Sequence, residues 1–360
     1  MDFSLTSEQQ DLRAAVRDVA ADRCSPGRLR EIIDAHEAYD ADLWRLVAGE
    51  LGLVGVAISE EHGGFGGSFV EAAVVIEQAG AALLPVPLLT GIVAAVAIDR
   101  GAPEVASDVL PPIATGKRTA ALVVAPDVVF DDEELGGIAR HVLDGERAET
   151  FVVAEPGGLW LVDRDDDGLD IVGAPSFDLT RRQATLWFGG VYVRQIGDAA
   201  ASAAAVDLLR VALAVESIGA ARHCLEATVD YLKTRQQFGK PIGSFQALQH
   251  RVADLAVDLE AATSTAYYAA WTAAASPTEL PVVAPLAKSV CTEAAYRIAA
   301  ETIQLHGGIG FTWEHDAHLY FKRATANRLL LGDSHEQRRL VADRARLHVG
   351  MHLKDIPDRA

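Results

Sequence analysis

Residues 235–246 read Arg-Gln-Gln-Phe-Gly-Lys-Pro-Ile-Gly-Ser-Phe-Gln, and residues 304–311 read Gln-Leu-His-Gly-Gly-Ile-Gly-Phe. The first stretch lies between two predicted helices and places an aromatic residue three positions after an arginine. A guanidinium can hold a phosphate through two hydrogen bonds, and an aromatic ring can stack on a base. The second stretch closes a predicted helix with glycines, which let a backbone approach a ligand or simply turn. Alone, each stretch is better explained by a helix end, so only their combination is informative.

The pattern of apolar residues around these stretches changes twice along the chain. Helical periodicity runs to about residue 115, with a long apolar helix expected from Phe69. Short runs rich in Val, Leu, Phe and Trp follow, and helical periodicity returns from residue 198. The sequence therefore predicts an α+β fold. Its expected parts are an N-terminal helical domain (1–117), a small central β-domain (118–197) and a C-terminal domain resembling a four-helix bundle (198–360).

Local patterns give further expectations within these domains. The C-terminal helices are expected to begin at Asp207, Gln246 and Thr278, with Ser244 as the N-cap of the second. The acidic run 163–167 is interpreted as a solvated hairpin loop, with metal binding as the minor alternative. The expected strands are Ala120–Val124, Phe151–Ala154, Leu159–Val162 and Ala184–Phe188.

Composition excludes several classes of protein. The 360 residues are half hydrophobic and 23% charged, which is typical of a globular chain. A net charge of −19 disfavours unaided binding to nucleic acid, which needs a basic surface. No apolar run is long enough for a membrane span, and the first residues do not read as a secretory signal. Three widely spaced cysteines suit a reducing compartment and form no zinc pattern, so a cytoplasmic protein without a metal site is expected.

Taken together, the two stretches resemble the C-terminal signature of the acyl-CoA dehydrogenase family. The signature is RxxFG with PIGxFQ, a helix, then QxHGGxGF and a terminal helix. The α–β–α order matches that family over nearly the whole chain, and residues 51–68, Leu-Gly-Leu-Val-Gly-Val-Ala-Ile-Ser-Glu-Glu-His-Gly-Gly-Phe-Gly-Gly-Ser, look like its early turn. The resemblance implies FAD as cofactor, an acyl-CoA substrate, and an electron-transfer flavoprotein or similar acceptor.

The resemblance also assigns residues to the cofactor. Arg235 would contact the FAD pyrophosphate and Phe238 the adenine side, while Gln304, Gly307 and Gly308 would line the nucleotide half. In the family these groups reach into the flavin site of a neighbouring subunit. A homodimer, a homotetramer or a heterotetramer with a second related chain is therefore expected.

The resemblance assigns substrate residues less completely. Arg210 matches an arginine that meets the CoA part of the substrate, with an ordinary helix arginine as the alternative. The two usual positions of the catalytic carboxylate hold Leu331 and Leu209, which cannot accept a proton. Glu216 lies in an apolar stretch seven residues after Leu209, about 10 Å along the same helix face, and is the predicted base. A buried ion pair is the alternative for Glu216, and Asp333, which also suits a helix N-cap, is the second candidate for the base.

The central domain departs from the family pattern. In the turn whose backbone should meet the flavin ring, residues 123–127, only Pro126 is retained. What remains resembles a shorter, actinobacterial-type branch linked to CoA thioesters of steroids and other bulky acids. The leading hypothesis is α,β-desaturation of an acyl-CoA. The alternatives are a non-catalytic partner subunit of a heteromeric enzyme and, third, a flavin monooxygenase on the same fold.

Overall fold

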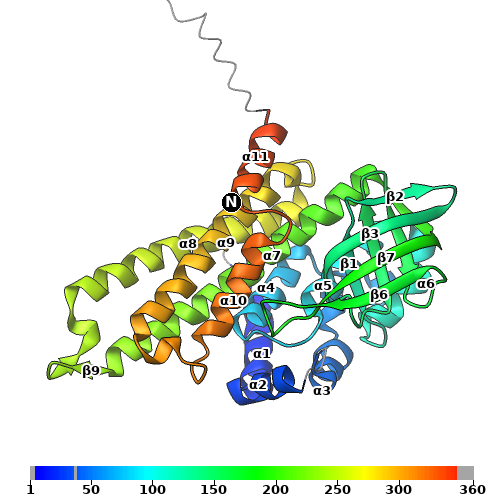
Figure 1. Ribbon diagram of the computed structural model, residues 1–360. Coiled ribbons are helices and arrows are strands. Elements are labelled where there is room, and N and C mark those ends of the chain that lie inside the picture. The colour runs from blue at the N-terminus through cyan, green and yellow to red at the C-terminus, as the bar shows by residue number, and fades with distance from the viewer. Residues whose placement is uncertain (1–4, 36–38, 347–360) are drawn as a thin grey trace, which may run out of the picture.

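The computed structural model describes residues 5–35 and 39–346. The last part of the predicted C-terminal domain, residues 347–360, therefore lies outside the described chain. Helices, then a β-domain, then longer helices follow one another, which confirms the expected α+β class (Figure 1). The N-terminal helices are α1 (Ser7–Arg23), α2 (Pro26–Asp34), α3 (Ala41–Trp44), α4 (Phe69–Ala81), α5 (Leu88–Asp99) and α6 (Pro103–Ala114). The predicted start at Phe69 is confirmed, and a capping box between Ser68 and Glu71 explains it.

The β-domain is a sandwich of two four-stranded sheets. Its strands are β1 (Ala120–Val124), β2 (Val128–Asp131), β3 (Glu134–Leu143), β4 (Thr150–Glu155), β5 (Gly158–Asp163), β6 (Leu169–Ala174), β7 (Gln183–Tyr192) and β8 (Arg194–Asp198). One sheet has the order β1-β4-β5-β8, with β1 and β4 parallel, and the other has the antiparallel order β2-β3-β7-β6. Alternate residues of β1 face opposite ways: Ala121 and Val123 pack between the sheets, whereas Ala120 and Leu122 pack on the helices.

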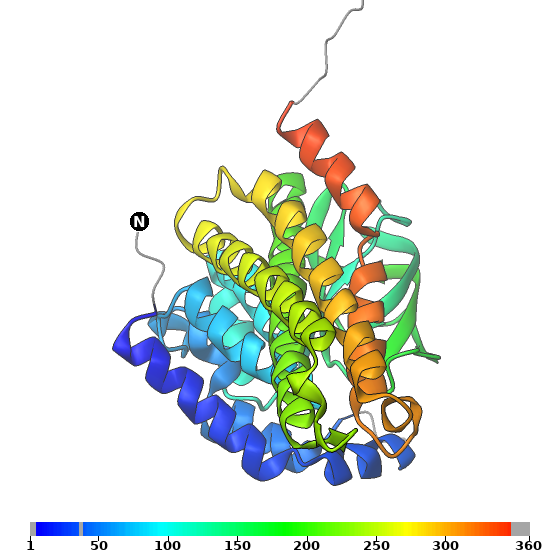
Figure 2. The same cartoon turned by 90° about the vertical axis from the view of Figure 1, so that its left-hand side faces the viewer.

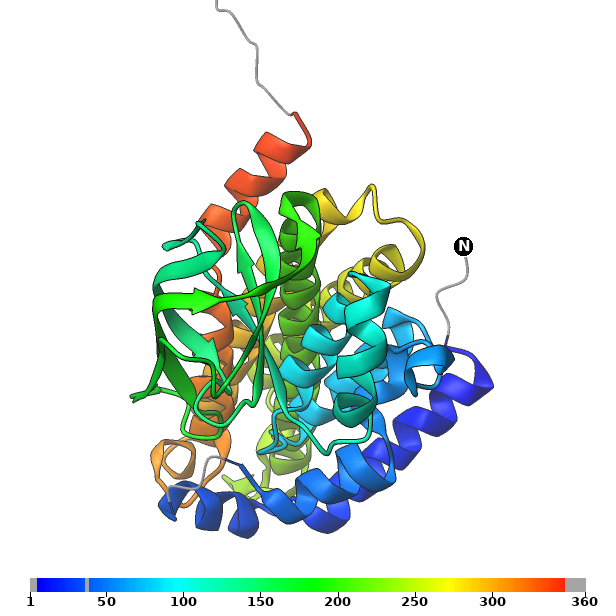
Figure 3. The same ribbon diagram turned by 90° about the vertical axis from the view of Figure 1, so that its right-hand side faces the viewer.

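The C-terminal helices form the bundle on which the other two parts pack. They are α7 (Ala199–Thr234), α8 (Gln246–Ala275), α9 (Leu280–His306), α10 (Ala317–Leu329) and α11 (Ser334–Arg344), and the short strands β9 (Gln236–Gln237) and β10 (Lys240–Pro241) follow α7. The long helices α7, α8 and α9 run side by side (Figure 2). Viewed from the other side, the β-domain and the N-terminal helices lie next to each other against the bundle (Figure 3).

Two glycines bring the N-terminal helices unusually close to the bundle. A Cβ atom on Gly219 of α7 would lie 1.9 Å from the backbone oxygen of Glu77, and one on Gly80 of α4 would lie 2.3 Å from that of Glu216. Any side chain at either position would therefore force α4 and α7 apart. Their close contact sets the position of Glu216 in the core.

Three local expectations were wrong. The helix expected from Asp207 begins at Ala199, because the Asp198 side chain caps it and an alanine-rich run follows. Ser244 does not cap α8: its hydroxyl donates to the Pro241 carbonyl in a turn, and Phe245 is the cap residue. The acidic run 163–167 is not a hairpin loop, because the strands on either side of it, β5 and β6, belong to different sheets.

Candidate active site

A large cavity lies where the β-domain meets the bundle, and we call it the junction cavity. Its volume is about 670 Å³, within the range of small-molecule sites. One wall comes from the β-domain, including Val124, Pro126, Ile138 and residues 140–143. The opposite wall comes from α7, the end of α10 and the segment that follows it. The retained proline of the predicted flavin turn thus lies at a cavity wall. This junction is where the folded chain offers room for a flat ring and a thioester.

Leu209 and Leu331 line this same cavity. They are 122 positions apart in the sequence, yet both positions that usually carry the catalytic carboxylate meet here, and both are apolar. Leu331 has a left-handed backbone (φ +59°), which is rare for a leucine and fixes its turn after α10. The titratable side chains that line the cavity in the described chain are Asp127, Arg140 and His141, all from the β-domain. The bundle wall therefore contributes no proton acceptor.

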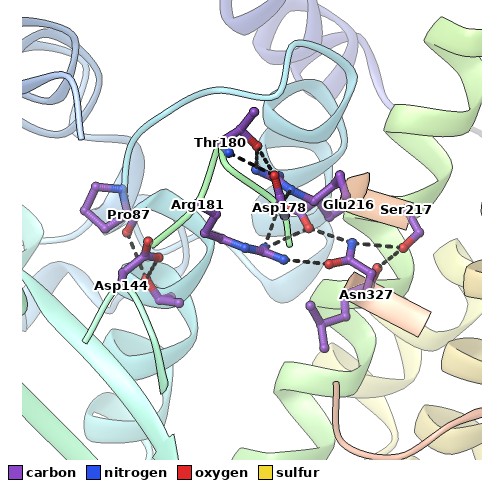
Figure 4. A network of polar contacts seen from close by, with 11 residues as sticks. Pro87, Asp144, Asp178, Thr180, Arg181, Glu216, Ser217 and Asn327 are labelled. Atoms are coloured by element: carbon purple, nitrogen blue, oxygen red, sulfur yellow. Dashed lines mark hydrogen bonds and ion pairs between the residues drawn. The ribbon is translucent and has the colours of Figure 1, made fainter. Parts of the chain in front are cut away.

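Glu216 lies outside the junction cavity, in a buried cluster of charges (Figure 4). Its side chain is only 5% exposed. Both carboxylate oxygens accept from Arg181 Nη1, at 3.1 and 3.0 Å, and Oε1 also accepts from Arg323 Nη1 at 2.8 Å. Oε2 accepts from Asn327 Nδ2 at 2.8 Å. Arg181 precedes β7 and the other two residues belong to α10, so this cluster joins the β-domain to the bundle.

The electrostatics of the cluster oppose proton abstraction by Glu216. Burial would raise the pKa of its carboxyl, but the charges of Arg181 and Arg323 and the hydrogen bond from Asn327 outweigh burial and lower it. A general base works best when its pKa is near the operating pH, and each lone pair engaged by a donor is unavailable for a proton. The geometry favours the buried ion pair, and the role of Glu216 as base stays a prediction.

The other predicted substrate residues are also engaged within the protein. Arg210 is buried, with Nη1 2.6 Å from Asp207 Oδ1 and Nε 3.2 Å from Gln337 Oε1, and it does not line the junction cavity. Asp333 is the N-cap of α11 and accepts from the backbone N–H groups of His335 and Glu336. Those hydrogen bonds, led by the one from Glu336, lower the pKa of Asp333. Its contacts are those of the capping role.

A second cavity, also of about 670 Å³, lies at the far ends of α7 and α9, and we call it the helix-end cavity. It brings together Arg235, Gln304, Gly307 and Gly308, four of the five residues assigned to the cofactor. The fifth, Phe238, does not line it. Phe238 is 90% exposed on the β9–β10 turn and packs edge-on against Phe245, with ring centroids 6.0 Å apart.

The helix-end cavity fits a nucleotide diphosphate. Among the described contacts the Arg235 guanidinium has no protein partner, so a permanent positive charge is free at the cavity wall. Gly307 has a backbone (φ +64°, ψ −139°) that favours glycine, and a Cβ on Gly307 or Gly308 would meet no atom within 4 Å. The bare backbone thus faces open space that a ligand can approach. A free cation beside an accessible backbone suits a phosphate.

Sequence reasoning missed several residues of these cavities. Tyr231, Arg251 and His306 also line the helix-end cavity, and the rings of Tyr231 and His306 stack 4.4 Å apart. Tyr231 was detectable, because it lies four residues before Arg235 and shares its helix face. Arg251 belongs to α8, and its place at the cavity depends on how α8 packs. His141 of the junction cavity lies within an irregularity in the pairing of β3 with β7, between Ala139 and Val142, which the sequence does not indicate.

Within residues 5–35 and 39–346, no three His, Cys, Asp or Glu side chains gather closely enough to bind a metal ion. Over the same residues, no helix combines the length and apolar character needed to cross a membrane.

Comparison with known proteins agrees with the observed fold. The N-terminal domain of acyl-CoA dehydrogenases matches residues 6–117 and the C-terminal domain matches residues 198–346. The acyl-CoA dehydrogenase IpdE2 of Mycobacterium tuberculosis is 38% identical over 91% of this chain and 94% of its own length. The chain belongs to the acyl-CoA dehydrogenase family. It is thus an oxidoreductase of the class that acts on the CH–CH group of acyl-CoA thioesters.

Two solved structures indicate which branch of the family the chain resembles. The Tcur3481–Tcur3483 steroid acyl-CoA dehydrogenase has a TM-score of 0.88 and 30% identity, and it covers 94% of this chain and 98% of its own. The ChsE4–ChsE5 complex of Mycobacterium tuberculosis has a TM-score of 0.90 and 27% identity, and it covers 96% and 99%. The expected resemblance to an actinobacterial, steroid-type branch is confirmed.

Proposed function

We propose that this chain is one subunit of an FAD-dependent dehydrogenase that introduces an α,β double bond into a bulky acyl-CoA, such as a steroid-derived thioester. The helix-end cavity carries the proposal, because the unpaired Arg235 faces it beside the bare backbone of Gly307 and Gly308. The identity to a steroid enzyme supports the substrate class. An electron-transfer flavoprotein or similar protein would reoxidise the cofactor.

The positions of the two cavities support a cofactor shared between chains. Leu213 lines the junction cavity and Tyr231 lines the helix-end cavity. They lie 18 positions apart on α7, about 27 Å along the helix axis. One chain therefore offers two separated half-sites. Arg235 would hold the diphosphate and Gly307–Gly308 would contact the nucleotide half of an FAD whose ring lies in a second chain. Bound FAD would supply the hydride acceptor, and the apolar junction wall would exclude water from the thioester.

We further infer that the second chain is a different, related protein. In a homo-oligomer, every junction cavity would have Leu209 and Leu331 at the two usual carboxylate positions. In every subunit the Glu216 carboxylate would also be held by Arg181 and Arg323. A related chain with a carboxylate at either position would supply the base, and this chain would complete its flavin site. The second candidate is a self-sufficient enzyme with Glu216 as base. This second candidate is favoured by the position of Glu216 on α7, because Glu216 lies only three residues after Leu213, which lines the junction cavity.

Flavin content tests both forms of the proposal. The chain is purified alone and together with a related chain that carries a family carboxylate, and bound flavin is measured by absorbance per subunit. We expect FAD retention to depend on the second chain. In the complex, Arg235→Ala should weaken FAD binding by about 1.5–3 kcal/mol, because a charge-assisted phosphate contact is lost.

Arg297→Ala is the matched control, because Arg297 is an exposed arginine of α9 paired with Asp258 and lies outside the cavity. Unchanged flavin occupancy in Arg235→Ala would overturn the nucleotide assignment. A chain that binds FAD and desaturates acyl-CoA when purified alone would overturn the heteromeric form and support the second candidate.

A further inference from the structure

Two histidine rings meet beside the helix-end cavity, and neither belongs to the groups assigned to the cofactor. His306, the last residue of α9, lines the cavity and is only 4% exposed. The half-buried His315, in the loop before α10, lies against it, with the ring centroids 4.4 Å apart and the ring planes tilted by 51°. Gly307 and Gly308, which also line the cavity, begin the segment that joins the two histidines.

Backbone hydrogen bonds indicate which nitrogen of each ring carries a proton. His306 Nδ1 lies 2.7 Å from the carbonyl oxygen of Thr302, which can only accept, so this nitrogen is protonated. His315 Nδ1 accepts from the backbone N–H of Ala317 at 3.1 Å, so this nitrogen carries a lone pair. The described arrangement therefore requires a neutral His315.

Protonation of His315 would disrupt this arrangement in two ways. A proton on Nδ1 would remove the acceptor for Ala317, the first residue of α10, and would place a positive charge near the N-terminus of that helix, where the helix dipole disfavours it. The charge would also lie beside His306, whose ring is buried and stacks on Tyr231. Burial lowers the pKa of His306 and the neighbouring His315 lowers it further, although the hydrogen bond to Thr302 opposes this. The site thus disfavours positive charge on both rings.

The surrounding charges offer little compensation for a protonated His315. The charged and titratable side chains near the pair are Tyr231 and Arg235 at the end of α7, Arg251 of α8, Glu301 of α9, Arg30 of α2, Glu314 and Asp316 of the loop, and His318 and Lys322 of α10. Two of the acids are already paired, Glu301 with Arg251 and Asp316 with Arg30. The third, Glu314, is exposed to solvent.

We propose that His315 is a proton sensor that controls the flavin half-site, an inference that rests on the proposed function of the helix-end cavity. At acidic pH a proton from solvent binds to Nδ1, releases the N–H of Ala317 and separates the loop from His306. The Gly307–Gly308 backbone belongs to the same segment and moves away from the nucleotide. FAD affinity therefore falls as pH falls through the range in which histidines titrate. Arg235 keeps its charge over that range, so it does not cause the change.

Hydrogen–deuterium exchange of the full chain tests the sensor without flavin. Peptides that cover residues 304–318 are compared at pH 7.5 and 5.5, after correction for the intrinsic pH dependence of amide exchange. We expect opening of this segment to increase about tenfold at pH 5.5, the effect of one histidine that is protonated only in the open segment with its ordinary pKa of about 6.5. His315→Asn should show no such increase, because asparagine can accept from the backbone N–H two residues further on and cannot take up a proton.

His335→Asn is the matched control, because His335 is an exposed histidine of α11 that does not line the helix-end cavity. Its segment 304–318 should open at pH 5.5 as it does in the wild type. Opening that does not change with pH in the wild type, or that increases equally in His315→Asn, would overturn the sensor whether or not FAD binds.

FAD affinity is then measured at the same two pH values in the complex with the related chain. We expect the wild type to bind FAD more weakly at pH 5.5, by up to about tenfold, and His315→Asn to bind it equally at both values. Tighter binding of FAD by the wild type at pH 5.5 would overturn the sensor, because a protonated histidine would then hold the diphosphate. A complex that binds no FAD at either pH would overturn the proposed function of the cavity, and the exchange measurement would still decide on the sensor.

Discussion

Replacement of Glu216 by glutamine distinguishes between two roles for this residue: a member of a buried ion pair and the general base. In the charged cluster, Glu216 and Asp178 face the guanidinium groups of Arg181 and Arg323. The amide of glutamine has the same shape but no charge, and its NH₂ group would face donors. Arg181 would then lose the carboxylate with which it forms an ion pair, and Arg323 would keep only Asp178. We expect the free energy of unfolding to fall by about 3–5 kcal/mol, the usual cost of removing one partner of a buried ion pair.

The assay is equilibrium unfolding in urea, followed by circular dichroism, with the denaturant dependence m compared between proteins. Glu226→Gln is the matched control: it makes the same change on α7 at an exposed position with no ion pair in the described chain, and it should shift stability by less than about 0.5 kcal/mol. The pKa of Glu216 is lowered in the folded state. Its contribution is therefore complete above its ordinary pKa of 4.5 and is lost as pH falls through the lowered folded value.

The opposite result would refute this reasoning. A Glu216→Gln protein with wild-type stability, normal acyl-CoA binding and flavin reduction slowed by about 10²–10⁴ would identify Glu216 as the general base. Flavin reduction is followed by anaerobic bleaching with a CoA thioester that the wild type turns over, in the flavin-containing complex.

Two further substitutions test the packing of the bundle. Lys288 is buried and donates to the Gly332 carbonyl at 2.7 Å, and burial lowers its pKa from 10.5 to about 8. Between these two pKa values the folded state binds fewer protons than the unfolded state, so the free energy of unfolding of the wild type, relative to that of Lys288→Met, should rise by up to about 3 kcal/mol from pH 8 to 10.5. Urea unfolding measures both proteins, and a difference between them that does not change with pH would contradict this. Gly219→Ala should destabilise the protein by at least about 3 kcal/mol, because its Cβ would lie 1.9 Å from the Glu77 backbone oxygen. Gly27→Ala is the control for Gly219→Ala: its Cβ would lie 3.9 Å from the Ser25 hydroxyl oxygen, so the melting temperature should be unchanged or higher.

The order of structural elements was predictable because it depends on local periodicity. The strands at Ala120–Val124 and Phe151–Ala154 were found from dense runs of apolar residues, whereas β3 was missed. β3 contains Gly136 and Gly137, and exposed and half-buried positions separate most of its buried ones, so no apolar run marks it. Its partners in the sheet, not its composition, hold it extended.

The residues predicted to bind the nucleotide could be proposed from the sequence for a related reason. Arg235 and Phe238 belong to one turn, and Gln304, Gly307 and Gly308 to another, so each group is a continuous motif. Only the fold shows that four of the five line one cavity and that Phe238 does not. Side-chain direction at a turn depends on the backbone, and Phe238 has a left-handed φ of +55° that directs it differently from its neighbours.

By itself, the sequence determined the family, the α–β–α order and the absence of a carboxylate at residues 209 and 331. The tertiary structure alone decided what surrounds Glu216. An apolar stretch of helix indicates burial, but Arg181 lies 35 positions before Glu216 and Arg323 lies 107 positions after it. Charges that far apart in the chain meet only when the β-domain and α10 pack on α7. Because a carboxylate takes its pKa from those neighbours, its chemistry is a property of the packing and not of the local sequence.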